Sequence, residues 1–518
     1  METKVALEMR NITKSFGTVY SNRNVDFSIN KGEIIALLGE NGSGKTSLMN
    51  MIAGIYYPDS GQIFIDGEEV IIRSPKDAFR YKIGMIHQHF KLVDVFSATE
   101  NIILGTKNES KFNLKDASNR VYEIARKYGF DIDPNKKIHE MSVSEKQTVE
   151  IVKVLYRGAD ILILDEPTAV LTPQETAKLF DVLRRMRDDG KSIIIITHKL
   201  HEVLSISDKV TVLRKGQYVG TVVTKETNES QLTEMMVGEK VSLNIKRSDP
   251  VDPKLRLKVE NLTSTNSDGI KVLDGVSFEA YSGEILGVAG IAGSGQRELL
   301  EAIAGLQHLD GGDIYYNDPK TNNTVDLRNR TPLQIRDLGV RLSFVPEDRL
   351  GMGLVGSMDI TDNMMLRSYQ NGHSFLLDRK QPKELAENII DSLKVVTPGT
   401  TTPVRRLSGG NVQKVLVGRE IAAAPTVLMA AYPVRGLDIN SSYLIYNLLT
   451  KQKESGVAVI FVGEDLDVLT ELCDRILVIN SGSITGIVDG RGSTKEEIGL
   501  LMTKNKEVTA EMEVERDD

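Results

Sequence analysis

The sequence of 518 residues predicts an α/β fold that occurs twice along the chain. Three observations support this prediction. Gly39 to Thr46 match G-x-x-x-x-G-K-[ST] and lie between an apolar run, Ile34 to Leu38, and a helix-like pattern, which is the strand, loop and helix order of a phosphate-binding loop. A second apolar run, Ile161 to Leu164, ends in two adjacent carboxylates. The motifs of the first half return, in the same order, in the second half.

The first element is the phosphate loop. Its glycines let the backbone wrap an anion with several N–H groups pointing inward, and the N-terminus of the following helix adds partial positive charge. Lys45 is expected to reach the β- and γ-phosphates of a nucleotide, and the Thr46 hydroxyl to bind Mg²⁺. The alternative is a glycine-rich turn with a chance lysine. The candidate nucleotide-binding residues are Gly39, Glu40, Asn41, Gly42, Ser43, Gly44, Lys45 and Thr46.

Other residues of the first half suit a nucleotide site. Phe16 is placed either to stack on a base or to fill the core. Gln88 follows a strand-like run and is placed to contact Mg²⁺ or the attacking water. Asp165 is expected on the metal side, and Glu166 beside it to orient or deprotonate water, unless the run simply ends in a solvated acidic turn. His198 follows another apolar run and suits sensing of the γ-phosphate, with a structural histidine as the alternative.

The repeat is seen at several landmarks. Near the phosphate loop, Phe27 pairs with Phe278 and Gly39 with Gly290, at an offset of 251 residues. The later pairs share an offset of 266, so the second copy carries 15 more residues between the landmarks: Gln147 with Gln413, Pro167 with Pro433, and Leu200 with Leu466. We therefore predict domain 1 at 1–245, a linker at 246–255 with two prolines, domain 2 at 256–503, and an acidic tail at 504–518.

Composition excludes several classes of protein. Charged residues at 26% and apolar residues at 40% are typical of a globular chain. The formal net charge of −8 argues against a protein that coats nucleic acid. The single cysteine, Cys473, rules out an internal disulfide framework, fits a reducing cytosol, and is expected to be a small buried apolar residue. Without an apolar run of 18 residues or a signal-peptide core, the chain is not expected to cross a membrane by itself.

These motifs resemble a known family. The phosphate loop, the glutamine, an L-S-G-G-type segment, ILILDEP and the histidine occur in that order in tandem ATPase domains of ABC transporters. The segments GMIHQHFKLVDVFSATENIILG, FVPEDR and LSGGNVQKVLVGREI resemble ATP-binding subunits of bacterial importers for simple sugars and nucleosides, and the wording His-Gln-His-Phe is most similar to the nucleoside branch.

The resemblance to this family also implies a domain architecture, cofactors, partners and a location. Each domain is expected to have a RecA-like parallel sheet core, an antiparallel β subdomain and a helical subdomain. The implied cofactors are ATP and Mg²⁺. The implied partners are two integral membrane permease subunits and an extracellular substrate-binding lipoprotein or binding protein, with no nucleic acid, and the implied location is peripheral, on the cytoplasmic face of the cell membrane.

The second copy has lost the polar groups of the first. Without charge-assisted contacts or a metal carboxylate, the second site is expected to bind nucleotide weakly or in a regulatory role, and not to hydrolyse it. In the order Lys45, Thr46, Asp165, Glu166, His198 and Gln88, the replacements are Gln296, Arg297, Ala431, Tyr432, Glu464 and Glu347.

The L-S-G-G segments show the reverse pattern. Domain 2 has Ser408, Gly409 and Gly410, whereas domain 1 has Ser142, Ser144 and a negative charge in the run Met141 to Glu145. In this family the domains pair head-to-tail, so that each ATP lies between one phosphate loop and the other domain's L-S-G-G segment. That geometry implies one competent site, which combines the phosphate loop of domain 1 with Ser408–Gly410, and one degenerate site. Thr172 stands where an aspartate is common and is expected to face across the interface.

Two other classes of protein share some of these features. A soluble ABC-type translation factor is also tandem, but usually has two working sites and a long charged connector. A DNA-repair or chromosome ATPase would have a coiled-coil insertion or a basic patch, and neither is found in the sequence. Within the transporter class, a simple sugar such as ribose or galactose is the alternative to a nucleoside.

Overall fold

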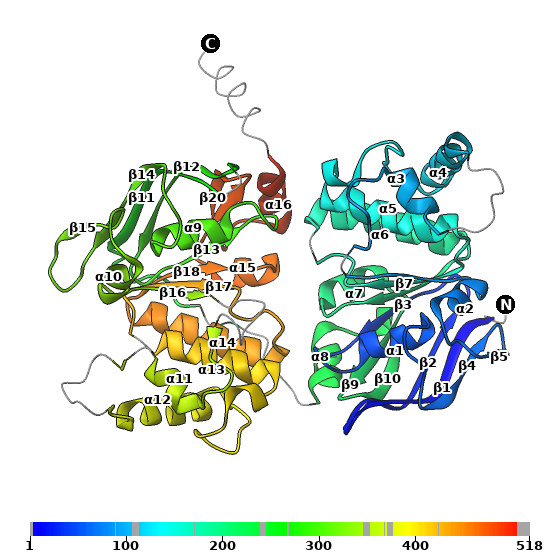
Figure 1. Cartoon of the computed structure of the whole chain (residues 1–518), viewed down its shortest axis with the longest axis horizontal. Coiled ribbons are helices and arrows are strands. Elements are labelled where there is room, and N and C mark those ends of the chain that lie inside the picture. The colour runs from blue at the N-terminus through cyan, green and yellow to red at the C-terminus, as the bar shows by residue number, and fades with distance from the viewer. Residues whose placement is uncertain are drawn as a thin grey trace, which may run out of the picture. The chain divides into compact units, whose positions relative to one another are not determined.

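The computed structural model describes residues 4–88, 90–105, 113–169, 171–238, 245, 247–266, 269–344, 353–366, 368–369, 377–422 and 424–504. The chain divides into two compact units, Met1–Ser242 and Leu243–Asp518, which we call unit 1 and unit 2. Each unit contains one six-stranded and one four-stranded sheet (Figure 1).

The six-stranded sheet of unit 1 is its central layer. Its strands β3, β8, β7 and β6 run parallel, and β10 is an antiparallel edge strand beside β9. Every residue of β3, β7 and β8 is buried, because layers of side chains cover both faces and the strands read as continuous apolar runs. The order of its strands is β10 (Gln217–Val223), β9 (Lys209–Arg214), β3 (Ile34–Leu38), β8 (Ser192–Ile196), β7 (Ile161–Asp165) and β6 (Ile83–Ile86).

The four-stranded sheet of unit 1 is antiparallel and packs on helix α1 (Lys45–Ile52). Leu7, Phe27, Leu37 and Leu48 belong to one buried cluster that joins this sheet, the central sheet and α1. This cluster fixes α1, and with it the start of the phosphate loop helix, against the core. The order of strands is β2 (Val19–Asn30), β1 (Val5–Phe16), β4 (Ser60–Ile65) and β5 (Glu68–Val70).

Three helices of unit 1 form a further cluster. Ala98, Val121 and Val149 bring α3, α4 and α5 together in a small core of their own. On the central sheet, Leu183 of α6 packs with Leu164 of β7. The helices after α1 are α2 (Pro75–Arg80), α3 (Ala98–Ile103), α4 (Leu114–Tyr128), α5 (Val143–Tyr156), α6 (Pro173–Asp188), α7 (Leu200–Ile206) and α8 (Glu229–Val237).

Unit 2 repeats this topology. Its central sheet has the order β16 (Val340–Phe344), β17 (Val427–Ala431), β18 (Ala458–Val462), β13 (Ile285–Ala289), β19 (Arg475–Asn480) and β20 (Ser483–Asp489). Its antiparallel sheet has the order β12 (Lys271–Tyr281), β11 (Leu255–Thr265), β14 (Gly311–Asn317) and β15 (Thr324–Asp326). The helices are α9 (Gln296–Ile303), α10 (Pro332–Asp337), α11 (Ile360–Met365), α12 (Lys380–Ser392), α13 (Gly409–Ile421), α14 (Ile439–Glu454), α15 (Leu466–Leu472) and α16 (Lys495–Thr503). The predicted fold class, with a parallel core, an antiparallel sheet and a helical part in each copy, is confirmed.

The duplication extends to single hydrogen bonds. In unit 1 the backbone N–H of Ile34 donates to the carboxylate of Asp208 at 2.8 Å. At the same place in unit 2, Ile285 donates to Asp474, also at 2.8 Å. These bonds fasten the first central strand of each unit to the start of its neighbour, and they show that the two copies share their scaffold in detail.

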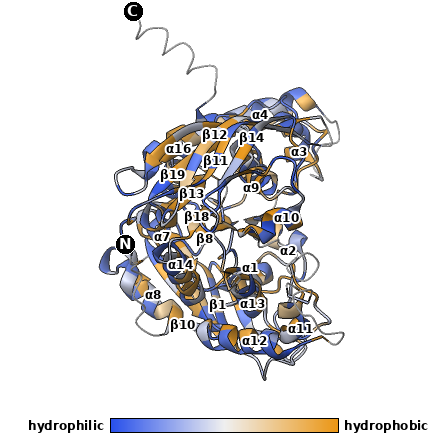
Figure 2. Cartoon of the chain, turned by 90° about the vertical axis from the view of Figure 1, so that its left-hand side faces the viewer, coloured by the Kyte–Doolittle hydropathy of each residue, from blue (hydrophilic) through white to orange (hydrophobic). Residues whose placement is uncertain are grey.

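Side-chain polarity follows the sheets. Buried and exposed residues alternate along β12, which is expected for an antiparallel strand with one covered face, and β11 and β12 show mixed blue and orange segments in Figure 2. Within the described part of the chain, no helix has the length and apolarity needed to cross a membrane.

The single cysteine lies inside unit 2. Cys473 is 0% exposed, and its side chain packs against Gly287 of β13, where an added Cβ would lie 2.8 Å from the Cys473 sulfur. Burial raises the pKa of the thiol. The prediction that Cys473 is a small buried apolar residue is confirmed.

Candidate active site

The predicted polar residues of unit 1 meet at one edge of the central sheet. The strands β3, β8, β7 and β6 are parallel neighbours, so their carboxyl ends lie together. The phosphate loop follows β3, Gln88 follows β6, and Glu166 and His198 follow β7 and β8. The fold thus brings together, from four separate parts of the chain, the side chains that the sequence singled out.

Two glycines of the phosphate loop are required by close backbone approach. A Cβ on Gly39 would lie 2.4 Å from the carbonyl oxygen of Leu213, and a Cβ on Gly44 would lie 2.3 Å from that of Ser21. Gly44 also has a φ of +95°, in the left-handed region that glycine tolerates best. The conformation of the loop is therefore set by its neighbours within unit 1.

Lys45 begins α1 and is held by the loop it follows. Its Nζ donates to the carbonyl oxygens of Gly39 at 2.6 Å and of Glu40 at 3.0 Å, and the residue is 7% exposed. Burial lowers the pKa of this amine, while the carboxylates of Glu166 and Asp165 act in the opposite direction. The ammonium group is thus positioned above the loop, where the phosphates of a nucleotide would lie.

Asp165 ends β7 and contacts the helix that follows the loop. It is 8% exposed, and its carboxylate accepts a hydrogen bond from the Thr46 side chain. Burial, and next the charge of Glu166, raise the pKa of Asp165 to about 6. Because burial and the charge of Glu166 destabilise the ionised form of this carboxylate, a cation bound beside it would stabilise that form. Carboxylate and hydroxyl oxygens are ligands that Mg²⁺ accepts. The pair therefore fits one magnesium ion.

No larger metal cluster accompanies this pair. Among the described residues, no group of three or more His, Cys, Asp or Glu side chains is placed to hold a metal ion.

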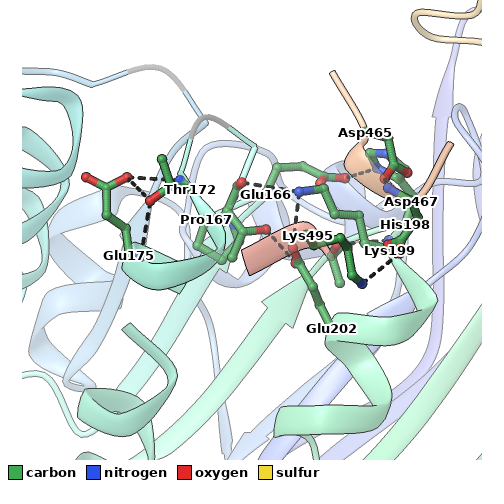
Figure 3. Close-up of polar contacts among 12 residues, drawn as sticks. Glu166, Pro167, Thr172, Glu175, His198, Lys199, Glu202, Asp465, Asp467 and Lys495 are labelled. Carbon is green, nitrogen blue, oxygen red and sulfur yellow. Dashed lines mark hydrogen bonds and ion pairs between the residues drawn. The ribbon is translucent and has the colours of Figure 1, made fainter. Parts of the chain in front are cut away.

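Glu166 and His198 form the most direct polar contact of the site. Oε1 of Glu166 lies 2.8 Å from Nδ1 of His198, and this contact is drawn in Figure 3. The hydrogen bond to Glu166 is the main cause that raises the pKa of His198. The second carboxylate oxygen, Oε2, is buried and has no hydrogen-bond partner within the described structure. One oxygen is therefore engaged by the histidine, and the other is available to accept a proton or a water hydrogen bond.

The backbone of Glu166 is unusual. Its φ is +48°, a left-handed conformation that is uncommon for a residue with a side chain. Its N–H donates to the carbonyl oxygen of Ile196 at 2.9 Å, which ties the turn to the end of β8. Strained residues of this kind cluster at functional sites, where the surroundings hold them.

Phe16 and Gln88 lie at the surface. Phe16 is 47% exposed, so the alternative that it fills the core is wrong; its ring packs edge-on against Tyr56 at a centroid distance of 5.2 Å. One face of an aromatic ring held in this way remains able to stack on a base. Gln88 is exposed, two residues beyond the end of β6 and beside the end of β7.

In unit 2 the phosphate loop keeps its shape and loses its charge. Gln296 is 4% exposed, and its Nε2 donates at 3.0 Å to the carbonyl oxygen of Ile291, the counterpart of Glu40. An amide thus makes the structural bond that Lys45 makes in unit 1. Arg297 forms an ion pair with Glu301 one turn along α9, at 2.7 Å. Its guanidinium therefore has a partner within its own helix.

The turn after β17 also survives without its reactive groups. Ala431 ends the strand, and Tyr432 has a φ of +51° and donates its N–H to the carbonyl oxygen of Val462 at 2.9 Å, as Glu166 does to Ile196. Glu464 pairs with Arg435 at 3.4 Å. Glu347, the predicted counterpart of Gln88, lies outside the described residues.

The two L-S-G-G-type segments begin helices that are capped differently. At the start of α13, the Ser408 hydroxyl accepts from the N–H of Asn411 at 3.4 Å, and no acidic side chain lies in the first turn. At the start of α5, Ser142 and Glu145 form a reciprocal capping box, with the Ser142 N–H donating to Glu145 at 2.7 Å. Lys136 pairs with the same carboxylate at 2.6 Å. The N-terminus of α5 is therefore already occupied by the carboxylate of Glu145. The Ser-x-x-Glu pattern signals this capping role, which is not among the sequence predictions.

Close packing within unit 2 does not require a glycine at position 410 of α13. A Cβ on Gly410 would meet only a side-chain carbon of Leu437, at 3.7 Å. Among the described residues outside its own helix backbone, no other atom lies that near to Gly410, so the Cβ of Ser144 at the counterpart position of unit 1 would hinder only a group that approaches the helix from outside.

Thr172 has a role that is not among the sequence predictions. The residue is 1% exposed and caps α6, with its hydroxyl and N–H both directed to Glu175 at 3.1 and 2.9 Å (Figure 3). In unit 2, Asp438 caps α14, and its carboxylate accepts from the N–H of Ser441 at 2.8 Å. The polar groups of Thr172 thus cap its own helix, and the expectation that Thr172 faces across the interface stays a prediction.

Comparison with known proteins agrees with this architecture. The family model described as ABC transporter matches residues 22–169 and 273–433. The chain is 40% identical to the nucleoside import ATP-binding protein NupA of Lactococcus lactis subsp. cremoris, over 97% of this chain and 99% of that one. It is 41% identical to the guanosine import ATP-binding protein NupO of Bacillus subtilis, over 96% of this chain and 97% of that one. It is 36% identical to a ribose import ATP-binding protein of Escherichia coli O157:H7, over 97% of this chain and 98% of that one.

The family model covers more than half of the chain in two copies, one in each unit. The relatives are matched over nearly their whole length, and both findings agree with the resemblance drawn from the motifs. The chain therefore belongs to the ABC transporter family, as an ATPase of that family.

Proposed function

We propose that this chain hydrolyses ATP at a single competent site, whose phosphate loop and catalytic groups lie in unit 1, and so powers the import of a solute through separate membrane chains. One observation carries the proposal. The two units share their strands, their turns and even their hydrogen bonds, yet the phosphate lysine, the metal carboxylate and the Glu166–His198 pair occur in unit 1 alone.

ATP is held by the edge of the central sheet. The backbone N–H groups of the phosphate loop and the N-terminus of α1 take the phosphates, Lys45 contributes its charge, and Phe16 stacks on the base. Thr46, Asp165 and Gln88 would hold Mg²⁺, which when bound would offset the negative charge of the phosphates.

Glu166 and His198 act on the attacking water. The free Oε2 of Glu166 accepts a proton from water as the water oxygen forms a bond to the γ-phosphorus, and the bond between that phosphorus and the oxygen of ADP breaks. General-base assistance of this kind contributes about 10²–10⁴-fold to the rate. His198 holds the other oxygen of the carboxylate and contacts the γ-phosphate, so that the base keeps its orientation.

The site is completed by the other unit. We assign Ser408, Gly409 and Gly410 to the competent site, and the segment with Ser142 and Ser144 to the degenerate one. The caps of the two helices support this assignment, because α13 begins without an acidic side chain, whereas α5 begins with the carboxylate of Glu145. An approaching phosphate would be attracted by the N-terminus of α13, whereas the N-terminus of α5 is already occupied by the carboxylate of Glu145, which is paired with Lys136.

Nucleotide binding then favours the closed arrangement of the units, and hydrolysis releases it. Membrane permease subunits must convert that motion into transport, with a substrate-binding protein on the outer side, so that the chain works as a peripheral protein on the inner face of the membrane. Nucleosides are the favoured solutes, since the relatives named for nucleoside and guanosine import are 40% and 41% identical. A sugar is the second candidate, because the ribose relative is 36% identical over a similar length.

The one-site proposal is tested in the complex reconstituted with its membrane chains. We expect Glu166→Gln to abolish ATP turnover, because the base is lost, and Gln296→Ala to leave most of it. Equal losses in the two variants would contradict a single competent site. Uptake of labelled nucleosides, competed by ribose and by galactose, separates the two candidate solutes.

A further inference from the structure

The turn that carries Glu166 is tied at three points. Its own N–H donates to Ile196, as described above. The carbonyl oxygen of the next residue, Pro167, accepts from the Gln147 amide at 2.5 Å. The third tie is made by Thr168, whose hydroxyl and carbonyl oxygen are both bonded by residues at the start of α7.

Thr168 is 1% exposed and makes two hydrogen bonds to residues at the start of α7. Its hydroxyl donates to Oε2 of Glu202 at 2.5 Å, and its carbonyl oxygen accepts from Nζ of Lys199 at 3.2 Å. Lys199 and Glu202 also pair with each other at 3.1 Å. Lys199 and Glu202 are drawn beside Glu166 and His198 in Figure 3. We call Thr168, Lys199 and Glu202 the clamp.

The clamp lies between the segment that carries Glu166 and the segment that carries His198. Thr168 lies two residues after Glu166, and Lys199 directly follows His198. The clamp therefore joins the segment of the base to the segment of the histidine, next to the place where their side chains meet at 2.8 Å. A shift of either segment would open that contact.

Unit 2 is an internal control for the three ties. There the first tie is kept between Tyr432 and Val462 at 2.9 Å. The second is kept between Gln413 and Pro433 at 2.7 Å. The left-handed turn at Tyr432 thus keeps these two ties, and the ion pair of Glu464 with Arg435 at 3.4 Å joins the same two segments of unit 2.

The third tie cannot form in unit 2. The counterparts of Thr168, Lys199 and Glu202 are Val434, Asp465 and Val468. The two valines have no polar side-chain atoms, and aspartate has no donor when ionised. The clamp is thus dispensable for the fold of the turn, and it is absent from the copy that lacks the base and the histidine.

We propose that Thr168, Lys199 and Glu202 are positioning residues, which hold the Glu166–His198 pair in the geometry needed to activate water. The inference rests on the proposed function, namely that unit 1 hydrolyses ATP. Its physical basis is that Glu166 has a disfavoured backbone conformation and only one bonded carboxylate oxygen, so the third tie limits its movement.

The test replaces Thr168 by valine, the residue that unit 2 carries at this position. Valine keeps the shape and removes the hydroxyl. In the reconstituted complex we expect kcat for ATP to fall about 10-fold, with KM for ATP and nucleotide affinity changed less than about 2-fold, because misplacement of catalytic groups acts on the chemical step. Thr168→Ser keeps the hydroxyl and should restore most of kcat.

Thr233→Val is the matched control. Thr233 is also 1% exposed, and its hydroxyl donates to the carbonyl oxygen of Glu229 within α8, so this variant loses a comparable hydrogen bond away from the site. Glu202→Gln is the second arm, and the double variant Thr168→Val/Glu202→Gln should lose no more than the stronger single variant, because both act through one contact.

Each outcome decides between the proposals. If Thr168→Val and Thr233→Val lower the melting temperature and kcat alike, or if KM changes instead of kcat, the clamp is merely structural and the inference is wrong. If Glu166→Gln abolishes turnover while both clamp variants remain active, only the clamp fails. If Glu166→Gln stays active, the proposed site itself is wrong, and the clamp inference is overturned with it.

Discussion

The burial of the Asp165 carboxylate lowers the free energy of unfolding of the chain. Its pKa rises from an ordinary value of 3.8 to about 6, chiefly because the carboxylate is buried. Between these two pH values the folded protein holds a proton that the unfolded chain has lost. The free energy of unfolding therefore falls as pH rises through this window, and the full cost is present above pH 6.

We predict that Asp165→Asn stabilises the nucleotide-free chain. Asparagine has the same shape and no charge, so the gain should reach about 3 kcal/mol at pH 7.5 and about half of that at pH 5. Urea unfolding at the two pH values measures it, and Mg²⁺-dependent stabilisation by ATP should be lost. Asp181→Asn, on the exposed face of α6, serves as the control and should change stability by less than about 0.5 kcal/mol. An equal gain at both pH values would contradict the assigned cause.

The helix caps offer a way to test how the two units share one site. Ser142 and Ser408 each cap a helix through the side-chain oxygen, and each begins an L-S-G-G-type segment. Their structural roles are alike, whereas the proposed nucleotide contact belongs to Ser408 alone. A matched pair of substitutions therefore separates the cap from the contact.

We predict that Ser142→Ala and Ser408→Ala destabilise the chain equally, by about 1 kcal/mol each, because each removes one N-cap. Only Ser408→Ala should slow hydrolysis, by about 10-fold or more, since a hydrogen bond to a charged phosphate is worth about 1.5–3 kcal/mol. Urea unfolding and turnover of the reconstituted complex measure the two effects. Slower hydrolysis in Ser142→Ala, with Ser408→Ala unaffected, would reverse the assignment of the segments.

The elements were predictable to different degrees. Strands such as β3 and β7 follow from continuous apolar runs, and their parallel arrangement brings the predicted side chains to one edge. The clamp was not predictable, because the contact of Thr168 with Glu202 spans 34 residues and depends on how α7 is oriented. The capping role of Thr172 was missed because its position was compared with a family pattern, although Thr-x-x-Glu is itself a capping signal.

The two units of the molecule share one backbone scaffold and differ in the side chains at the nucleotide site. The loop after β13 repeats the loop after β3, with an amide in place of the ammonium group and an arginine paired within α9. The difference between the units is therefore concentrated in side chains, and the missing charge can in principle be returned without rebuilding the fold.

We predict that Gln296→Lys with Arg297→Thr tightens nucleotide binding by unit 2. The added ammonium and hydroxyl groups should lower the second dissociation constant about 10–100-fold, the equivalent of about 1.5–3 kcal/mol. Equilibrium dialysis of the full chain with labelled ATP and Mg²⁺ measures the number and strength of sites.

Hydrolysis should not rise in this variant, because Ala431 and Tyr432 still provide neither a metal carboxylate nor a base. Gln296→Met with Arg297→Thr is the uncharged control. A second site that stays as weak as in the control would show that more than the loop charge is missing from unit 2.

The burial of Cys473 has a practical consequence. Thiol reagents attack exposed thiolates, and this thiol is both enclosed in the core and held in its protonated form by burial. The native chain therefore serves as a background for labelling without any substitution of its own cysteine. Two surface cysteines, one in each unit, would be the only ones to take up a fluorescent or spin label, and the distance between them would follow the two units through a cycle of ATP binding and release.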